Sequence, residues 1–563
     1  MGIDINSRGQ MPVSPLATES IAEKHRQDAR TTRMFALTVV GIILCSALLR
    51  LYRIDAPLID GFWDKQIAVA NLSRSMAGPP FHLLNPSFDF CISPDGQRYL
   101  VTEEIPLYHA MVALGYRLFG EQDWFGRAVS AAGSLLAIAA FIGLMRREYD
   151  YGFALAAGVI FAVCPLLLYY GRAVIPDTCM LGFMLAAAYG FRRALDEDGL
   201  AWLIACGFAG LVAVAFKYYA LMVLLPMAEM AWRGQRAKGL IKLCLPVAMM
   251  IVPLAAWMLL IFFRTSNPSQ YTVYFIFQQP SILLESKFWS RLADRFLWKS
   301  CGPLTAILMG VGLCAVLSRR RRDCPDFRVS ENGTVPFGPT SRRTVGAVVS
   351  WTVMGLAFYF LLGPKSWGHE YYELMMLPGA AGLAALGWCF LFRRSAEENR
   401  LRSLQMPLGA CLLVLTAIIH SPWISDGRFR QDIGFMIAAQ SAQKHCSAAG
   451  RIVAGPFTPQ PIIHYARREG WTWQEYPGDM QNLLDGCKKH GAECVVLYFD
   501  RKIQPEERRR YDDLIKTLPI LEHQAGPWGL GQTPCEIYIL GLLEPGFKTE
   551  QMAEKSRTGG DKK

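Results

Sequence analysis

The chain has 563 residues, of which 52% are hydrophobic and only 19% are charged. A soluble chain of this length would divide into several domains and carry more charge, so the composition excludes an ordinary soluble protein. The formal net charge is +11. Most Arg and Lys residues stand at the ends of apolar blocks rather than on one soluble face, which excludes a nucleic-acid-binding protein and is typical of membrane proteins.

The apolar residues form eleven blocks, most of them long enough to cross a bilayer, which predicts an α-helical polytopic membrane protein. Several blocks are short or contain Gly and Pro, so one or two could be re-entrant. The polar residues 1–33 are predicted to form a disordered cytoplasmic tail, and the block starting at Met34 an uncleaved anchor. The predicted spans are residues 34–51, 124–145, 152–170, 176–191, 200–216, 218–232, 240–263, 297–317, 344–362, 371–392 and 406–421.

Every second connection between these spans is basic, and such connections stay in the cytoplasm. The N-terminus is therefore predicted to be cytoplasmic, and the long acidic loop 52–123 of the transmembrane domain 34–421 to face outward. The odd number of spans puts residues 422–563 on the outer side as well. The basic connections contain Arg146 and Arg147, Arg192 and Arg193, Arg233, Arg236 and Lys238, Arg319–Arg322, Arg342 and Arg343, and Arg393, Arg394, Arg400 and Arg402.

The segment 422–545 alternates strand and helix patterns, which predicts a small soluble α/β domain, followed by a disordered tail 546–563. Its four cysteines show no zinc-binding spacing, and some of them could pair in an oxidising compartment. Their pairing stays open at this point. The predicted strands are 451–456, 493–499 and 536–540, the predicted helices are 461–469, 480–490 and 505–518, and the cysteines are Cys446, Cys487, Cys494 and Cys535.

The first outer loop carries acidic residues next to amphipathic stretches. Asp60 and Asp64 flank an aromatic pair directly after the first span, where a carboxylate can act as general base towards a hydroxyl group. Either residue could instead cap the helix predicted to follow. Glu103 and Glu104 precede the stretch 105–119, where they either complement a helix dipole or add acidic groups to the same cavity.

Three ionisable residues stand at the edge of the membrane in later outward turns. Arg172 and Asp177 flank the turn between the third and fourth spans, and Lys217 lies between two apolar blocks. Ionisable groups at membrane depth are costly and usually functional. A lone ammonium such as Lys217 could bind a phosphate as a point charge. The alternatives are an Arg172–Asp177 ion pair and a Lys217 side chain that reaches to the interface.

The connection between the ninth and tenth predicted spans combines aromatic and polar residues. Tyr371 and Tyr372, with Trp367, fit an aromatic belt at the membrane surface. Lys365 and His369 offer cationic or hydrogen-bonding groups near a lipid head group. A belt accounts for the aromatic residues but less well for the charged ones.

Taken in order, these motifs resemble the C-type glycosyltransferases that use polyprenyl-phosphate sugars. The nearest branch is the bacterial one related to protein O-mannosyltransferases and the lipid A aminoarabinose transferase. The resemblance covers roughly residues 34–395, and the order of the motifs is more specific than any one of them. The motifs are Arg50-Leu51-Tyr52-Arg53-Ile54, Trp63-Asp64-Lys65-Gln66, Ser73-Arg74-Ser75-Met76, Glu104-Ile105-Pro106-Leu107-Tyr108, Leu118-Phe119-Gly120, Gly126-Arg127, Arg172 with Pro176-Asp177, Lys217-Tyr218-Tyr219 and His369-Glu370-Tyr371-Tyr372.

The resemblance implies a C-type glycosyltransferase fold and an inverting, mannosyltransferase-like transfer in the bacterial inner membrane. The donor would be a polyprenyl-phosphate sugar, and the acceptor a hydroxyl group of a lipid, glycan or protein on the non-cytoplasmic side. In that family an Asp of the first loop is the suspected base. Many relatives have an adjacent Asp-Glu pair there that this chain lacks, so Asp60 and Asp64 both stay candidates, with Asp60 favoured.

The same resemblance implies that the lipid phosphate meets cationic residues of this chain. They map to Arg172 and Lys217, with Lys365 and His369 as further candidates. Metal dependence varies among these enzymes, and no metal or other cofactor is assigned here. The alternative function is a transporter or flippase for a lipid-linked or small polar substrate, although the internal repeats common in transporters are absent from the sequence.

Overall fold

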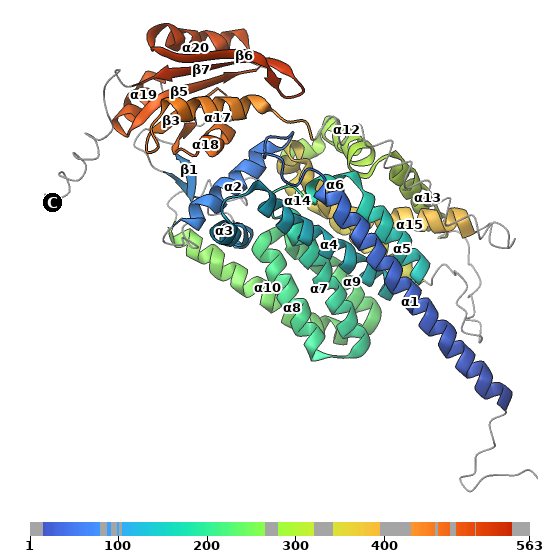
Figure 1. Ribbon diagram of the computed structural model, residues 1–563. Helices are drawn as coiled ribbons and strands as arrows, with labels where there is room; N and C mark the ends of the chain where they lie inside the picture. Colours follow the sequence, from blue (N-terminus) through green and yellow to red (C-terminus); the bar gives the residue numbers. More distant parts are fainter. Residues whose placement is uncertain are drawn as a thin grey trace, which may run out of the picture.

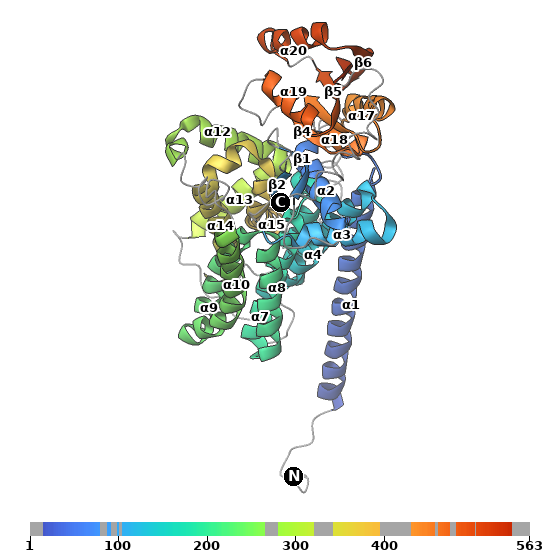
Figure 2. The ribbon, with the colours of Figure 1, turned by 90° about the vertical axis from the view of Figure 1, so that its left-hand side faces the viewer.

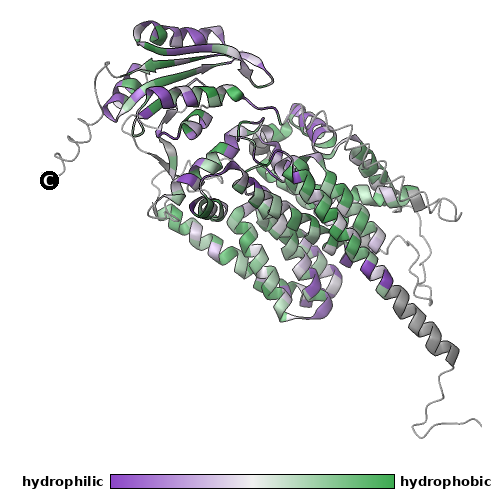
Figure 3. Ribbon diagram, viewed as in Figure 1, coloured by the Kyte–Doolittle hydropathy of each residue, from purple (hydrophilic) through white to green (hydrophobic). Residues whose placement is uncertain are grey.

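The computed structural model describes residues 15–78, 87–91, 98–100, 104–264, 280–319, 342–393, 429–456, 460–472, 480–500 and 503–542. These residues form a helical bundle and a domain built on a sheet, which sits on one end of the bundle in both views (Figures 1 and 2). The apolar residues are concentrated in the bundle (Figure 3). This is the arrangement predicted from the apolar blocks and from the alternating C-terminal segment.

Ten of the eleven predicted spans lie in the described residues, and each is largely helical. The eleventh, 406–421, lies outside the described residues. By length and composition, four described helices can cross a membrane, a bent pair is a further candidate, and three other apolar helices are shorter. The bundle helices are α1 (Pro15–Leu51), α4 (Asp123–Glu148), α5 (Tyr151–Val163), α6 (Pro165–Tyr170), α7 (Asp177–Glu197), α8 (Leu200–Phe216), η1 (Tyr218–Val223), α9 (Leu224–Gln235), α10 (Ala237–Arg264), η3 (Pro280–Leu284), α12 (Ser286–Asp294), η4 (Arg295–Cys301), α13 (Pro303–Arg319), α14 (Arg342–Gly368), η5 (Glu370–Met376) and α15 (Leu377–Arg393).

The structure differs most clearly from the predicted boundaries at three places. Helix α1 already begins at Pro15, so residues 15–33 are helical rather than part of a disordered tail. The predicted span 152–170 is interrupted at Cys164, because Pro165 lacks the N–H that would continue helix α5. The predicted span 297–317 is broken at Gly302, whose φ of +87° ends the preceding helix.

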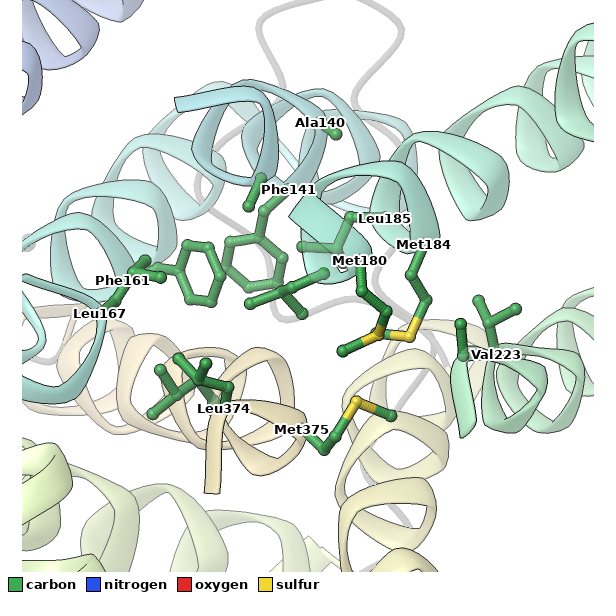
Figure 4. Packing of buried hydrophobic residues seen from close by; sticks show 14 of the residues in the cluster. Ala140, Phe141, Phe161, Leu167, Met180, Met184, Leu185, Val223, Leu374 and Met375 are labelled. Carbon is green, nitrogen blue, oxygen red and sulfur yellow. The ribbon is translucent and has the colours of Figure 1, made fainter. Parts of the chain in front are cut away.

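Small residues let the central helices approach closely. A Cβ atom on Gly133 of α4 would lie 2.6 Å from the Cα atom of Cys179 in α7. Such contacts are the usual basis of helix association inside membranes, because lipid supplies no hydrophobic drive between helices. Around them Phe141 of α4 packs on Phe161 of α5 with ring centroids 4.6 Å apart, beside Met180 of α7 (Figure 4).

The end of the bundle away from the sheet is closed by ion pairs. The carboxylate of Glu148, which is only 2% exposed, pairs with Arg192 at 2.9 Å and Arg233 at 2.7 Å. Arg147 pairs with Glu197 at 2.9 Å. Three of the basic connections predicted to share one side of the membrane therefore meet at one end, where hydrophilic residues gather (Figure 3).

The C-terminal domain contains a seven-stranded mixed sheet with the strand order β2-β1-β4-β3-β5-β7-β6. All three predicted strands and all three predicted helices are present, whereas α17, β4 and β6 were not predicted. The elements are β3 (Arg451–Gly455), β4 (Gly470–Thr472), β5 (Ala492–Phe499), β6 (Ile520–Gly529) and β7 (Thr533–Gly541), with helices α17 (Ile433–His445), α18 (Gln460–Ala466), α19 (Met480–Lys489) and α20 (Pro505–Thr517). The disulfide Cys446–Cys494 joins the end of α17 to β5, while Cys487 and Cys535 are buried and take no part in a disulfide among the described residues.

Two strands of that sheet come from the first outer loop. Strand β1 (Ser87–Cys91) pairs parallel with β4, with Phe90 opposite Gly470, and β2 (Arg98–Leu100) pairs with β1. The same loop supplies α2 (Trp63–Ala77), which is the helix predicted to follow Asp60 and Asp64, and α3 (Leu107–Phe119), which lies in the predicted stretch 105–119. The loop and the C-terminal domain therefore share one sheet at one end of the molecule, a link that the predicted domain division did not include.

Candidate functional site

Asp60 lies in the turn between α1 and α2 and is buried. Its Oδ1 atom accepts hydrogen bonds from Tyr169 Oη at 2.7 Å, Gln66 Nε2 at 2.8 Å and the Phe62 backbone N at 3.2 Å. Its Oδ2 atom lies 3.8 Å from Arg127 Nη2. The N-cap of α2 is Phe62, without a side-chain hydrogen bond, so neither Asp60 nor Asp64 has the capping role considered as the alternative.

Two buried arginines hold the backbone around Asp60. Arg127 of α4 donates from Nη1 to Ile54 O at 3.1 Å and to Ala56 O, and from Nη2 to Pro57 O at 3.1 Å. Arg172 donates from Nη2 to Arg53 O at 2.5 Å, and makes no ion pair with Asp177. We call Asp60, Gln66, Arg127, Tyr169 and Arg172 the Asp60 centre. Both arginine heads fix the carbonyls of the loop that presents the carboxylate.

A second cluster forms around Lys217, at the end of α8. Its ammonium group pairs with Glu104, and both side chains are largely buried. Tyr219, in η1, donates a hydrogen bond to Asp177 Oδ1 at the start of α7, and Lys217 also interacts electrostatically with Asp177. We call Glu104, Asp177, Lys217 and Tyr219 the Lys217 centre. All of its members except Tyr219 were predicted as site residues.

Aromatic side chains join the two centres. Phe62, which follows Asp60 closely in the chain, packs on Tyr170 at 5.1 Å and on Tyr371 at 5.5 Å between ring centroids. Tyr371 lies 4.5 Å from Tyr372, and Tyr372 lies 5.7 Å from the Tyr219 ring of the Lys217 centre. Continuous contacts therefore connect the two clusters. The chain folds so that helix ends far apart in sequence meet at one place.

His369 joins this aromatic group, with its ring 5.4 Å from that of Tyr371. Its neighbour Glu370 accepts a hydrogen bond from Tyr170 Oη at 2.9 Å. Glu370 was not predicted as a site residue, although it lies inside the His369–Tyr372 motif. The polar residues of this motif therefore contact its tyrosines and Tyr170, which an aromatic belt at the membrane surface does not explain.

Three predicted site residues do not join these contacts. Asp64 is half-buried in the first turn of α2 and makes no hydrogen bond or ion pair with another described residue. Glu103 and the side chain of Lys365 lie outside what the structure describes. Within the described ranges, no group of three or more His, Cys, Asp and Glu residues could hold a metal ion.

The C-terminal domain forms hydrogen bonds with the other side of the Asp60 loop. The backbone N of Asp432 donates to Ile59 O at 2.9 Å, and Leu58 N donates to Tyr465 Oη at 2.5 Å. The Tyr465 hydroxyl in turn donates to Asp123 Oδ2 at 2.9 Å. Neither Asp432 nor Tyr465 was singled out in the sequence, because nothing near Tyr465 marks a contact with a residue 407 positions away, and the same holds for Asp432 and Ile59.

A buried histidine extends this contact between domain and loop. His464 of α18 lies with Nδ1 2.6 Å from Asn71 Oδ1, and its backbone O accepts from Arg74 Nη1 at 2.8 Å. Burial, followed by the neighbouring Arg74 cation, lowers the pKa of His464, so the ring is neutral at pH 7. A neutral ring can donate its Nδ1 hydrogen to the Asn71 oxygen.

Comparison with known proteins agrees with this architecture. Residues 103–262 match the model of the dolichyl-phosphate-mannose-protein mannosyltransferase family. ArnT from Cupriavidus metallidurans bound to undecaprenyl phosphate superposes with a TM-score of 0.55 at 15% identity, covering 90% of this chain and 98% of that one. No curated protein matches the chain significantly.

Two further solved structures show the same fold. The Archaeoglobus fulgidus oligosaccharyltransferase in complex with Zn and sulfate has a TM-score of 0.54 at 12% identity, over 82% of this chain and 67% of that one. The mycobacterial arabinofuranosyltransferase AftD has a TM-score of 0.53 at 15% identity, over 90% of this chain and 40% of that one.

The chain therefore has the fold of the C-type glycosyltransferases, as predicted. Its resemblance to the protein mannosyltransferase and ArnT-like family, first drawn from the order of its motifs, is confirmed. The segment that matches the family model runs from α3 through most of α10 and includes Arg127, Arg172, Asp177 and Lys217.

Proposed function

We propose that the protein is a membrane glycosyltransferase that moves a sugar from a polyprenyl-phosphate carrier to an acceptor hydroxyl group, with inversion at the anomeric carbon. One observation carries the proposal: the Asp60 and Lys217 centres are joined by continuous contacts within the fold of an undecaprenyl-phosphate-bound transferase. In such an arrangement the carboxylate can take the proton of an attacking hydroxyl group, and the cation can stabilise the departing phosphate.

Lys217 and Arg172 are the proposed partners of the donor phosphate. Lys217 is neutralised by Glu104, and a phosphate oxygen can replace that carboxylate as its partner. Arg172 has a buried Nη1 atom without a hydrogen-bond partner among the described residues. A buried donor without a partner is rare and calls for an explanation, and binding of an anion supplies one. Negative charge that develops on the phosphate is stabilised by both cations.

Asp60 is the proposed general base. Three hydrogen bonds fix its Oδ1 atom, whereas Oδ2 has only the distant Arg127 contact and can accept a proton. The acceptor hydroxyl group gives its proton to Oδ2, and its oxygen forms a bond to the anomeric carbon. The bond between that carbon and the phosphate oxygen breaks, and its electron pair leaves with the phosphate. Asp64, closer to solvent, is the second candidate for this role.

The reaction is proposed to occur on the non-cytoplasmic side of a bacterial inner membrane. The basic connections at the far end of the bundle support a cytoplasmic position for that end, and for the N-terminus. The disulfide Cys446–Cys494 supports an oxidising compartment for the C-terminal domain. The acceptor would then be a lipid, glycan or protein of the cell envelope, approached from the side of the sheet.

Purified full-length protein should be incubated with a panel of radiolabelled polyprenyl-phosphate sugars, including mannose and aminoarabinose carriers, together with envelope lipids. We expect one sugar to pass from the carrier to an acceptor, and we expect no transport of free solutes into liposomes. Label that stays on the carrier across the whole panel, with protein of unchanged melting temperature, would overturn the proposal.

A further inference from the structure

Helices α12 and η4 follow one another directly and form a single helix over Ser286–Cys301. This helix meets the apolar helix α13 at an angle of 111°. We take the apolar helix α13 to run through the bilayer, which would place Ser286–Cys301, at this angle to it, close to the membrane plane. In both views α12 is at the end of the bundle that carries the C-terminal domain (Figures 1 and 2).

The helix carries four cations at intervals of four residues. They are Lys287, Arg291, Arg295 and Lys299, and Asp294 is the only acidic residue within the helix. Residues four apart lie above one another on a helix surface, so the four form one stripe. The wider turn of the π-helical part of η4 offsets the drift that an α-helix would give the last member of the stripe.

The apolar side of the same helix is packed on the bundle. Phe288, Leu292 and Phe296, also four residues apart, are all buried, and the Phe288 ring stacks on Trp367 at 5.8 Å. Arg295 is the member of the stripe whose head turns back to the bundle, where it pairs with the buried Glu373 and donates to Trp367 O at 3.1 Å, and these contacts hold the helix in this orientation. The helix is therefore fixed, and its outward side is set.

The remaining three cations face outward. Lys287, Arg291 and Lys299 are exposed and make no ion pair with a described residue, although the Arg291 head also lies 4.6 Å from the Trp367 ring centroid. Next to Lys299, the Trp298 side chain is 53% exposed. An exposed Trp beside cations on a helix in the membrane plane is typical of segments at the boundary between lipid and water.

We propose that Lys287, Arg291 and Lys299 bind the phosphate groups of anionic phospholipids in the leaflet on the side of the C-terminal domain. Charge complementarity selects this occupant. Three exposed cations that pair with no acidic side chain of the described residues lie on a helix parallel to the surface where lipid phosphates stand, and Trp298 adds an apolar contact to the same lipids. The site does not depend on the proposed glycosyl transfer, and it would hold for any function of the bundle.

The test uses full-length protein in nanodiscs of equal parts phosphatidylglycerol and phosphatidylcholine. After transfer to detergent and washing, the ratio of the two retained lipids is measured by mass spectrometry. The triple variant K287Q/R291Q/K299Q is expected to lower the retained phosphatidylglycerol ratio at least threefold. The matched variant K488Q/K489Q/R509Q removes the same charge from exposed positions of the C-terminal domain and is expected to leave the ratio unchanged.

A conservative variant, K287R/K299R, keeps the charge and is expected to retain the wild-type ratio, which separates binding from any loss of folding. Raising the NaCl concentration during the wash should release phosphatidylglycerol from the wild type, because such contacts are screened. The proposal is overturned if the glutamine triple variant keeps the wild-type ratio, or if the control variant loses as much lipid as the stripe variant.

Discussion

The Asp60 centre and the Lys217 centre are built in different ways. At the Asp60 centre, side chains bind mostly to backbone: Arg127 and Arg172 hold four carbonyl groups between Arg53 and Pro57, and Asp60 itself accepts a backbone hydrogen. At the Lys217 centre, charged side chains bind to other side chains. One centre therefore fixes a loop, and the other neutralises charged side chains with one another.

This difference has a consequence for ligands. Contacts to backbone can be replaced only if the loop itself moves, so the Asp60 centre is organised before any substrate arrives. A side-chain pair such as Lys217–Glu104 exchanges partners by rotation of side-chain bonds, so an incoming phosphate can take the place of the carboxylate. We expect substitutions at the two centres to have different effects. Those at the Asp60 centre should lower turnover and stability, and those at the Lys217 centre should lower the affinity for the donor.

The largest effect is expected from Asp60→Asn. The amide keeps the size of the side chain and can still accept the Tyr169 hydrogen, but it cannot take up a proton. Turnover is expected to fall by about 10³-fold, within the usual range for a general base, while the Kd of the donor lipid stays within about threefold. Turnover and donor binding should be measured on the same preparation.

Asp64→Asn is the matched control for this experiment, because Asp64 lies one helical turn away and has no partner among the described residues. We expect it to change turnover by less than about tenfold, a loss below that of a missing general base. If Asp64→Asn instead removes activity and Asp60→Asn keeps it, the roles of the two carboxylates are reversed and the base is the residue closer to solvent.

Arg127→Met tests whether the Asp60 centre fixes its loop. The variant leaves a buried carboxylate without its cation and three backbone carbonyls without donors. Removal of one partner from a buried pair typically costs about 3–5 kcal/mol, so we expect a loss of that size in the free energy of unfolding. Arg147→Gln, which breaks a pair about one-third exposed at the other end, should cost less than about 1 kcal/mol.

Lys217→Gln tests the exchangeable centre. Without the ammonium group the donor phosphate loses a charge-assisted contact, so the KM for the donor is expected to rise by about 10²-fold, which corresponds to ~2.7 kcal/mol. Lys242→Gln is the control, because Lys242 also pairs with one carboxylate, that of Asp198, but at the opposite end of the bundle. An equal rise in KM for both variants would contradict a specific phosphate contact at Lys217.

The sequence predicted the bundle and most of the Lys217 centre for the same reason. A bilayer demands long apolar blocks, and it makes each charge inside them conspicuous. Lys217 and Asp177 stood out in this way. Arg127 did not, because it lies near the start of a predicted span, where an arginine is ordinary. Its partners are backbone carbonyls, which leave no mark on the sequence.

The contacts between the first outer loop and the C-terminal domain could not be predicted from the sequence either. Strand β1 is short and pairs with residues that follow it by about 380 positions, and no local pattern specifies such a pairing. The predicted strands of the C-terminal domain were found because each one alternates with a helix. Strand β6 was missed, since its Gly and Pro residues weaken the strand signal.

Tyr465→Phe tests whether the C-terminal domain positions Asp60. The change removes the hydroxyl group that accepts a hydrogen bond from Leu58 N and donates one to Asp123. Leu58 lies two residues before Asp60 in the chain. Turnover is expected to fall by about tenfold, or ~1.4 kcal/mol, with the KM for the donor unchanged. Tyr538→Phe, which removes a part-buried hydroxyl contact on β7 away from the Asp60 loop, should leave both constants unchanged. A purely structural role would lower the melting temperature without this separation of turnover from KM.

The smallest expected effect is a pH dependence of stability at Asp432, the other residue of the C-terminal domain that contacts the Asp60 loop. Burial raises the pKa of Asp432 to about 6, although a hydrogen bond from Tyr498 opposes the shift and the nearby Asp500 adds to it. The folded state therefore holds this proton more tightly than the unfolded chain, whose Asp pKa is about 3.9. The contribution to stability is complete below pH 3.9 and is lost as the pH rises to about 6. Asp432→Asn keeps the backbone donor to Ile59 but cannot titrate, so the free energy of unfolding, measured against pH, should lose this part of its slope. An unchanged slope in the variant would mean that Asp432 does not hold its proton in the folded protein.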